Sequence, residues 1–125
     1  MKRILIVGAT SGIGEGLARL YAERGEVKIG VMGRRSDRLK DLCASFPAVF
    51  EAEECDVTDT EALPVALERL ASRLGEVDVL VLSSGTGDLN PELDYAVERR
   101  TLDTNVTGWT CVVEWAIRYF ENRGQ

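Results

Sequence analysis

The sequence predicts an α/β fold in which helices cover both faces of a parallel sheet. Short β-branched runs alternate along the chain with helical patterns of ten or more residues, which is typical of βαβ units. The run at residues 77–82 is almost continuously apolar, as expected of a parallel strand that is covered on both sides. Right-handed crossovers then place the helices on both faces of the sheet.

The first helix is expected to run from about Gly12 to Arg24, because the glycine at position 25 is a typical helix stop. We expect Gly16 to let this helix approach the sheet. Its apolar face is expected to consist of Ile13, Leu17, Leu20 and Tyr21. The four expected strands lie at residues 4–7, 27–32, 49–52 and 77–82.

A second helix is expected to begin at Ser36, whose hydroxyl would cap the first turn, and to end before Pro47. Its apolar residues are Leu39, Leu42 and Phe46. A third helix is expected to begin near Asp59 or Thr60 and to end at Gly75. Its apolar residues are Leu63, Leu67, Leu70 and Leu74.

The last segment is expected to begin at Asn90-Pro91, because a capping side chain followed by proline at the first helical position is typical of a helix start. The helical pattern continues to Asn122. This length predicts two helices that meet near residues 105–108.

The composition describes one folded domain over residues 1–125, because a hydrophobic content of 45% excludes disorder. The net charge of −6 disfavours nucleic acid and membrane surfaces as partners, since its field repels both. The chain has no histidine, which excludes Ser-His-Asp triads and most zinc sites, so no metal is expected. Cys43, Cys55 and Cys111 have no ligand spacing and are expected to be reduced thiols in a cytoplasmic protein.

A glycine-rich turn connects the first strand to the first helix. Amide groups without a neighbouring Cβ can cradle a phosphate at a helix N-terminus, so a nucleotide cofactor is the leading ligand hypothesis. The alternative is an ordinary turn without a ligand. The expected contacts in this turn are Gly8, Thr10, Ser11, Gly12, Ile13 and Gly14.

The end of the second strand carries Arg34 and Arg35 and no acidic residue. Two guanidinium groups there favour NADP(H) over NAD(H), because they can pair with a ribose 2′-phosphate, and Arg34 is the stronger candidate. A solvated basic corner is the alternative. Asp56-Val57 follows the third strand, where the carboxylate would either accept from an adenine amino group or support a turn. Ser83-Ser84-Gly85 follows the fourth strand and would approach a ribose or nicotinamide, or form a flexible loop.

These motifs resemble, in order, the N-terminal half of the short-chain dehydrogenase/reductase family, over nearly the whole chain. The family's T-G-x-x-x-G-x-G turn corresponds to Gly8, Gly12 and Gly14, without the usual first threonine. Its Asp-Val pair matches residues 56–57, and its N-N-A-G motif falls on residues 82–85, where serines take the place of asparagine. Its N-V-x-G context matches residues 105–108, which makes Asn105 the expected asparagine of the catalytic tetrad.

The resemblance implies hydride transfer between a nicotinamide and a carbonyl or alcohol, with a Tyr-x-x-x-Lys pair and a serine at the reacting centre. Tyr95 and Tyr119 are each followed four residues later by arginine and lie in amphipathic patterns, so we interpret both as core or surface residues. The chain is therefore expected to be a truncated cofactor-binding half that is inactive alone. The alternative is a catalytically silent nucleotide-binding or interaction module.

The expected fold is Rossmann-like, with three αβα layers, strand order 3-2-1-4 and a cofactor crevice between strands 1 and 4. It would stop before the family's later strands, which leaves strand 4 as an open edge. We therefore expect a homo-oligomer built on strand 4 or on the last helix. The apolar residues of that helix are Trp109, Val112, Val113, Trp115, Ile117 and Phe120.

Overall fold

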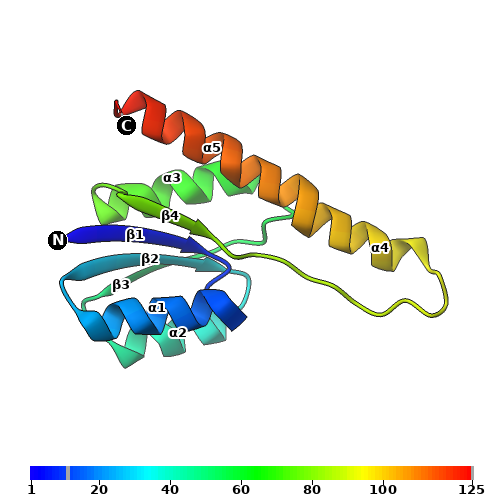
Figure 1. Ribbon diagram of the computed structural model, residues 1–125, viewed down its shortest axis with the longest axis horizontal. Helices are drawn as coiled ribbons and strands as arrows, with labels where there is room; N and C mark the ends of the chain where they lie inside the picture. The colour runs from blue at the N-terminus through cyan, green and yellow to red at the C-terminus, as the bar shows by residue number, and fades with distance from the viewer. Residues whose placement is uncertain (11, 125) are drawn as a thin grey trace.

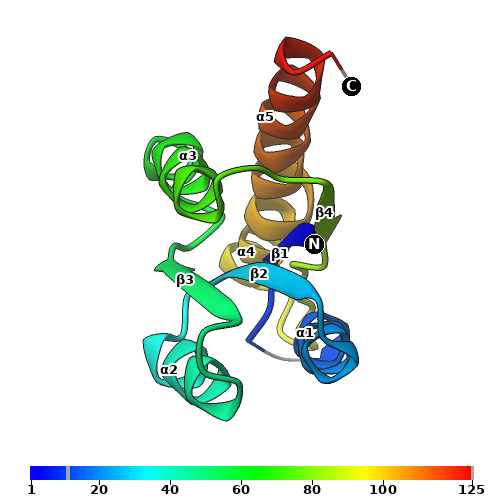
Figure 2. The same cartoon turned by 90° about the vertical axis from the view of Figure 1, so that its left-hand side faces the viewer.

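A computed structural model describes residues 1–10 and 12–124 of the 125-residue chain and confirms the α/β fold (Figure 1). The two helices α1 and α2 cover one face of the sheet, and α3 and α5 cover the other (Figure 2). The elements are β1 (Lys2–Val7), α1 (Gly12–Arg24), β2 (Val27–Gly33), α2 (Ser36–Ser45), β3 (Phe50–Glu54), α3 (Ala62–Leu74), β4 (Val79–Leu82), α4 (Tyr95–Leu102), a π-helical turn η1 (Asp103–Gly108) and α5 (Trp109–Asn122).

The sheet is parallel and has the expected strand order, β3-β2-β1-β4. Strand β1 is central, and Ile4 lies opposite both Ile29 of β2 and Val79 of β4. Its side chains alternate between two cores, as strand geometry requires. Ile4 and Ile6 pack with α1 and α2, whereas Leu5 and Val7 pack with α3 and α5.

Helix α1 has the expected bounds, but only two of the four residues predicted for its buried face pack against the core. Ile13 is 77% exposed and Leu20 is 45% exposed, whereas Leu17 and Tyr21 are partly buried. The buried residues are Gly14, Ala18 and Ala22. These small residues recur at four-residue spacing, which lets the helix axis lie closer to the sheet than larger side chains would allow. Gly16, which has open space around it, plays no part in this approach.

Helices α2 and α3 follow the predicted apolar patterns, with differences at their N-termini. Leu39 and Leu42 are buried in α2, but Ser36 is the first helical residue and therefore lies one position beyond the cap. Helix α3 begins at Ala62, two or three residues later than expected, and the side chain of Asp59 accepts a hydrogen bond from the amide of Ala62 at 3.2 Å. Its four predicted leucines are all buried, and Gly75 ends it as predicted.

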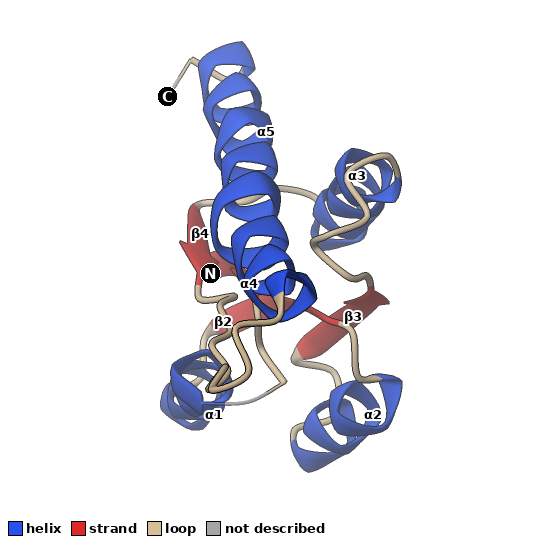
Figure 3. Ribbon diagram, turned by 90° about the vertical axis from the view of Figure 1, so that its right-hand side faces the viewer, coloured by secondary structure: helices blue, strands red, loops and turns tan. Residues whose placement is uncertain are grey.

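The last segment begins at Tyr95 and not at Asn90-Pro91. The side chain of Asp94 caps α4, accepting from the amide of Ala96 at 3.0 Å, while Asn90 accepts from the amide of Asp94 at 2.9 Å and shapes the preceding turn. Helix α4 continues through η1 into α5 as one rod (Figure 1 and Figure 3). The two predicted helices are thus α4 and α5, and they meet, as predicted, near residues 105–108, where the π-helical turn η1 joins them.

Helix α5 packs on α3 and on the start of β4. Val112, expected on an open face, is fully buried because that side of the helix faces α3. The Tyr119 hydroxyl accepts from the amide of Val77 at 3.0 Å, and Trp115 Nε1 donates to Glu68 at 3.1 Å. Among the described residues, no helix has the length and apolar character needed to cross a membrane.

Candidate functional site

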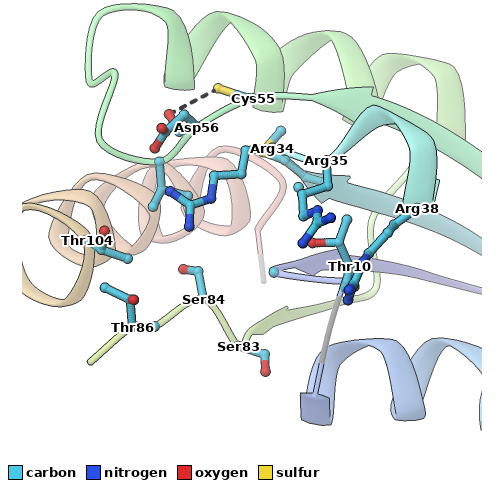
Figure 4. A pocket seen from close by; sticks show the side chains of 15 residues that line it. Thr10, Arg34, Arg35, Arg38, Cys55, Asp56, Ser83, Ser84, Thr86 and Thr104 are labelled. Atoms are coloured by element: carbon cyan, nitrogen blue, oxygen red, sulfur yellow. Dashed lines mark hydrogen bonds between the residues drawn. The ribbon is translucent and has the colours of Figure 1, made fainter. Parts of the chain in front are cut away.

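A pocket of about 190 Å³ opens at the carboxyl edge of the sheet, where all four strands end (Figure 4). This edge is where α/β sheets bind ligands at the switch in strand order. Its walls are formed by the turns that follow β1, β2, β3 and β4. The lining residues are Gly8, Thr10, Met32, Gly33, Arg34, Arg35, Arg38, Cys55, Asp56, Val57, Ser83, Ser84, Gly85, Thr86 and Thr104.

Most of the predicted site residues meet in this pocket, although they come from four separate turns. The predicted residues that line it are Gly8, Thr10, Arg34, Arg35, Asp56, Val57, Ser83, Ser84 and Gly85. Gly12, Ile13 and Gly14 do not line it and instead form the first turn of α1. Ser11 lies outside the described residues.

The glycine turn is anchored to the end of β2. The amides of Gly8 and Ala9 both donate to the carbonyl of Met32, at 2.9 and 3.1 Å. Gly8 has φ +88°, and a Cβ there would lie 2.5 Å from the amide nitrogen of Ser84, so glycine is what lets the loop after β4 lie against the turn. The first amides of α1 have no acceptor within the helix, which leaves an electropositive helix end beside the pocket.

Three arginines give the pocket its positive charge. Arg34 has no hydrogen bond or ion pair with any residue in the described part of the chain. Arg35 Nε lies 4.0 Å from the carboxylate of Asp37. Both side chains are exposed, so this ion pair does little to fix the position of the Arg35 guanidinium. Arg38 Nη1 donates to the carbonyl oxygen of Thr10 at 3.0 Å. In Figure 4, Arg35 and Arg38 lie beside Thr10, whereas Arg34 extends toward Asp56.

Asp56 supports the turn that follows β3. Its Oδ1 accepts from the amide of Thr58 at 2.9 Å and from the Thr58 hydroxyl at 2.8 Å. The turn role is therefore confirmed, and the contact with an adenine amino group stays a prediction. The neighbouring Cys55 is buried in the pocket wall, and this burial, together with the carboxylates of Asp59 and Asp56, raises the pKa of its thiol. Cys55 is thus protonated near neutral pH and is a poor nucleophile.

The loop after β4 carries a buried hydroxyl that lacks a partner. The amide of Ser83 donates to the carbonyl of Val7 at 2.8 Å, which fixes the loop against β1. Ser84 Oγ is buried and has no hydrogen-bond partner among the described residues. A buried polar atom of this kind is costly unless a ligand or water satisfies it.

Asn105 holds the same loop from η1. Its Oδ1 accepts from the amide of Thr86 at 2.9 Å, and its Nδ2 donates to the carbonyl of Thr86 at 2.8 Å. Asn105 does not line the pocket, but it fixes the position of Thr86, which does. Its assignment to the catalytic tetrad stays a prediction.

Tyr95 and Tyr119, interpreted from the sequence as core or surface residues, both lie outside the pocket. The hydroxyl of Tyr119 accepts a hydrogen bond from the amide of Val77, and Tyr95 is 69% exposed on α4. Within residues 1–10 and 12–124, no three His, Cys, Asp or Glu side chains form a group that could hold a metal ion. The groups that line the pocket, which include arginine side chains and the hydroxyls of threonine and serine, are of the kind that binds an anionic ligand.

Arg38 is the main pocket residue that the sequence interpretation missed. Its only signal is a third arginine in the first turn of the helix that follows the Arg34-Arg35 pair. Thr104 was also missed, because nothing in the local sequence indicates that η1 lies over the loop after β4.

A family model described as "short chain dehydrogenase" matches residues 2–125. Serine 3-dehydrogenase of Rhizobium radiobacter is 38% identical over 109 residues, which is 84% of this chain and 43% of that protein. The solved structure of a short-chain type dehydrogenase/reductase from Mycobacterium marinum is 34% identical with a TM-score of 0.85, and the match covers 98% of this chain and 51% of that one.

A solved structure of 3-ketoacyl-(acyl-carrier-protein) reductase from Brucella melitensis is complexed with NADH. It is 28% identical with a TM-score of 0.85, and the match covers 98% of this chain and 51% of that one. The chain spans about half the length of the curated relatives it matches.

Proposed function

The chain belongs to the short-chain dehydrogenase family, and from that premise we propose that residues 1–125 are the cofactor-binding half of an NADP(H)-dependent oxidoreductase. The reaction is hydride transfer between the nicotinamide and a carbonyl or alcohol substrate. The nicotinamide supplies or accepts the hydride when it is bound, and this half of the protein binds and orients the dinucleotide. The cofactor class is that of the Brucella melitensis reductase, which is complexed with NADH.

The observation that carries the choice of NADP(H) is the pair of arginines at the end of β2. Arg34 has no partner within the described residues, and residues 34–36, which directly follow β2, include no carboxylate that could bind a free ribose 2′-hydroxyl. A guanidinium pairs with a phosphate through two parallel hydrogen bonds, which strongly favours a phosphorylated ribose. NAD(H) is less favoured, because residues 34–36 offer no carboxylate to accept a hydrogen bond from its ribose 2′-hydroxyl.

The remaining pocket residues suit the rest of a dinucleotide. The amides at the start of α1 would hold the pyrophosphate, because they are unpaired within the helix and lie at its positive end. The buried Ser84 hydroxyl would find its missing partner in a ribose hydroxyl. The pocket volume, about 190 Å³, is below the roughly 300 to 1,000 Å³ of a pocket that surrounds a whole ligand, so it would enclose only part of the dinucleotide.

We propose that residues 1–125 bind the cofactor without turning it over. None of the tyrosines of the printed sequence is followed by lysine at the fourth position, and Tyr95 and Tyr119 lie outside the pocket. Asn105 would contribute by holding the loop at Thr86 in place beside the nicotinamide. A catalytically silent nucleotide-binding module is the second candidate, favoured by the same absence.

Reading the gene past the codon for Gln125 separates these two candidates. The oxidoreductase proposal expects a serine and Tyr-x-x-x-Lys in the continuing frame. A protein made from that longer frame is expected to oxidise NADPH with at least one member of a carbonyl panel, while residues 1–125 alone bind NADPH without oxidising it. If the longer protein binds NADPH but does not oxidise it with any carbonyl of the panel, that result would contradict the oxidoreductase proposal and support the silent module.

We further propose a homo-oligomer in the reducing cytoplasm, without nucleic-acid or membrane partners. The net charge of −6 and the three free cysteines support this environment. Exposed apolar residues on the last helical rod support association there: Val106 is 54% exposed, Trp109 45% and Ile117 53%.

A further inference from the structure

Arg38 connects two elements of the site that are far apart in the sequence. It lies in the first turn of α2, and its Nη1 donates to the carbonyl oxygen of Thr10 in the glycine turn at 3.0 Å. The two residues are separated by 28 positions, and the bond is partly buried. A hydrogen bond from a charged donor in such a place is stronger than one between neutral groups.

Thr10 is enclosed on its other sides by the end of β2. It is only 8% exposed, and a Cβ added to Gly33 would lie 2.4 Å from the Thr10 methyl group, so this methyl occupies the space that a side chain at position 33 would fill. The amides of Gly8 and Ala9 are bonded to Met32. The first half of the glycine turn is thus fixed by hydrogen bonds to β2. Arg38 adds a further hydrogen bond, to the carbonyl of Thr10 shortly before α1.

The three arginines of the pocket therefore have different surroundings. Arg34 makes no contact of hydrogen-bond or ion-pair type with another described residue, which leaves its guanidinium available to a ligand. Arg38 uses part of its guanidinium on the protein backbone. A residue that acts on the turn affects the site of the pyrophosphate, which NADPH and NADH share.

We propose that Arg38 is a positioning residue that holds the glycine turn in its binding form, and that it governs the affinity for both dinucleotides and not the choice between them. This inference rests on the proposed function for its ligand. Without Arg38, the amides at the start of α1 become more mobile, and binding must first order them. The selection of the 2′-phosphate belongs to Arg34.

The test compares Arg38→Met with Arg34→Ala in the 125-residue chain, by titration with NADPH and NADH. Arg38→Met is expected to weaken binding of both cofactors by about the same factor, roughly 5- to 20-fold, which corresponds to one partly exposed charged hydrogen bond. Arg34→Ala is expected to weaken NADPH binding alone. Arg24→Met, which removes an exposed arginine in the last turn of α1, at the opposite end of that helix from the glycine turn, is the matched control and is expected to change neither.

Amide hydrogen exchange of residues 12–14 in the ligand-free protein gives a second readout. Exchange is expected to be faster in Arg38→Met and unchanged in Arg34→Ala. This readout still decides the role of Arg38 if the unmodified chain binds no dinucleotide, a result that would overturn only the proposed function. If Arg38→Met fails to fold, Arg38→Lys takes its place, with a smaller but equal loss for both cofactors.

Three results would overturn the proposal. A selective loss of NADPH binding would make Arg38 a phosphate-selecting residue. Unchanged affinity for both cofactors would remove its role in binding. Unchanged exchange of residues 12–14 would show that the turn does not depend on Arg38.

Discussion

Gly14→Ala is expected to destabilise the fold by about 2 to 3 kcal/mol and to abolish NADPH binding. A Cβ at this position would lie 2.0 Å from the carbonyl oxygen of Gly8 and 2.9 Å from its carbonyl carbon. Backbone atoms cannot move aside as the end of a flexible side chain does, so α1 must shift away from β1. That shift displaces the amides at the start of the helix, which are the proposed pyrophosphate site.

Gly16→Ala is the matched control on the same helix. Gly16 is exposed, and a Cβ there would meet no atom within 4 Å. Alanine is the better helix former by about 1 kcal/mol, so this variant is expected to be as stable as the unmodified chain or slightly more so, with unchanged NADPH affinity. Urea unfolding and cofactor titration measure both variants. Equal stability and equal affinity of the two would contradict the close approach of α1 to β1.

Arg34→Ala is expected to weaken NADPH binding by about 1 to 3 kcal/mol and to leave NADH binding unchanged. The reason is that only NADPH carries the 2′-phosphate with which the guanidinium would pair. Arg34→Lys keeps the charge but loses the planar donor fork, so its loss is expected to be smaller. An NADPH-to-NADH affinity ratio that stays the same in Arg34→Ala would remove the argument for this residue.

Arg35→Ala is the companion variant for this prediction. Arg35 has an acidic neighbour, Asp37, at 4.0 Å, and about half of its side chain is exposed. Its guanidinium is therefore partly screened, and the loss of NADPH affinity is expected to be smaller than for Arg34→Ala. If Arg35→Ala lost more NADPH affinity than Arg34→Ala, Arg35 and not Arg34 would be the main partner of the 2′-phosphate.

The sheet and the location of the site follow from the sequence because both depend on chain order. Parallel strands joined by helices have their carboxyl ends at one edge, so residues after each strand meet there whatever their distance along the chain. This is why Gly8, Arg34, Asp56 and Ser84 could be grouped before the structure was known. The prediction that these residues meet requires no knowledge of how side chains pack.

The differences arise where tertiary contacts outweigh local pattern. The large apolar residues of α1 predicted its buried face, but close packing on the sheet selected Gly14, Ala18 and Ala22 instead. Asn90-Pro91 has a strong local capping signal, yet Asp94 supplies the cap. Such choices depend on the distance between elements, which hydrophobic periodicity does not report.

The contact between Arg38 and Thr10 was beyond local prediction for a related reason. It depends on the conformation of one long side chain and on the distance between α2 and the glycine turn. The same holds for the two hydrogen bonds by which Asn105 brackets Thr86, since they require the π-helical turn η1 above the loop after β4.

Calorimetric titration of the folded 125-residue chain with NADPH, NADH and ATP tests the central claim most directly. The claim is that amides at the glycine turn bind a pyrophosphate and that Arg34 selects the phosphorylated ribose. The predicted result is binding of both dinucleotides, with NADPH at least about fivefold tighter than NADH, as expected from a charged hydrogen bond of at least about 1 kcal/mol, and with ATP weaker than NADPH. No heat of binding for either dinucleotide at millimolar concentration would contradict it.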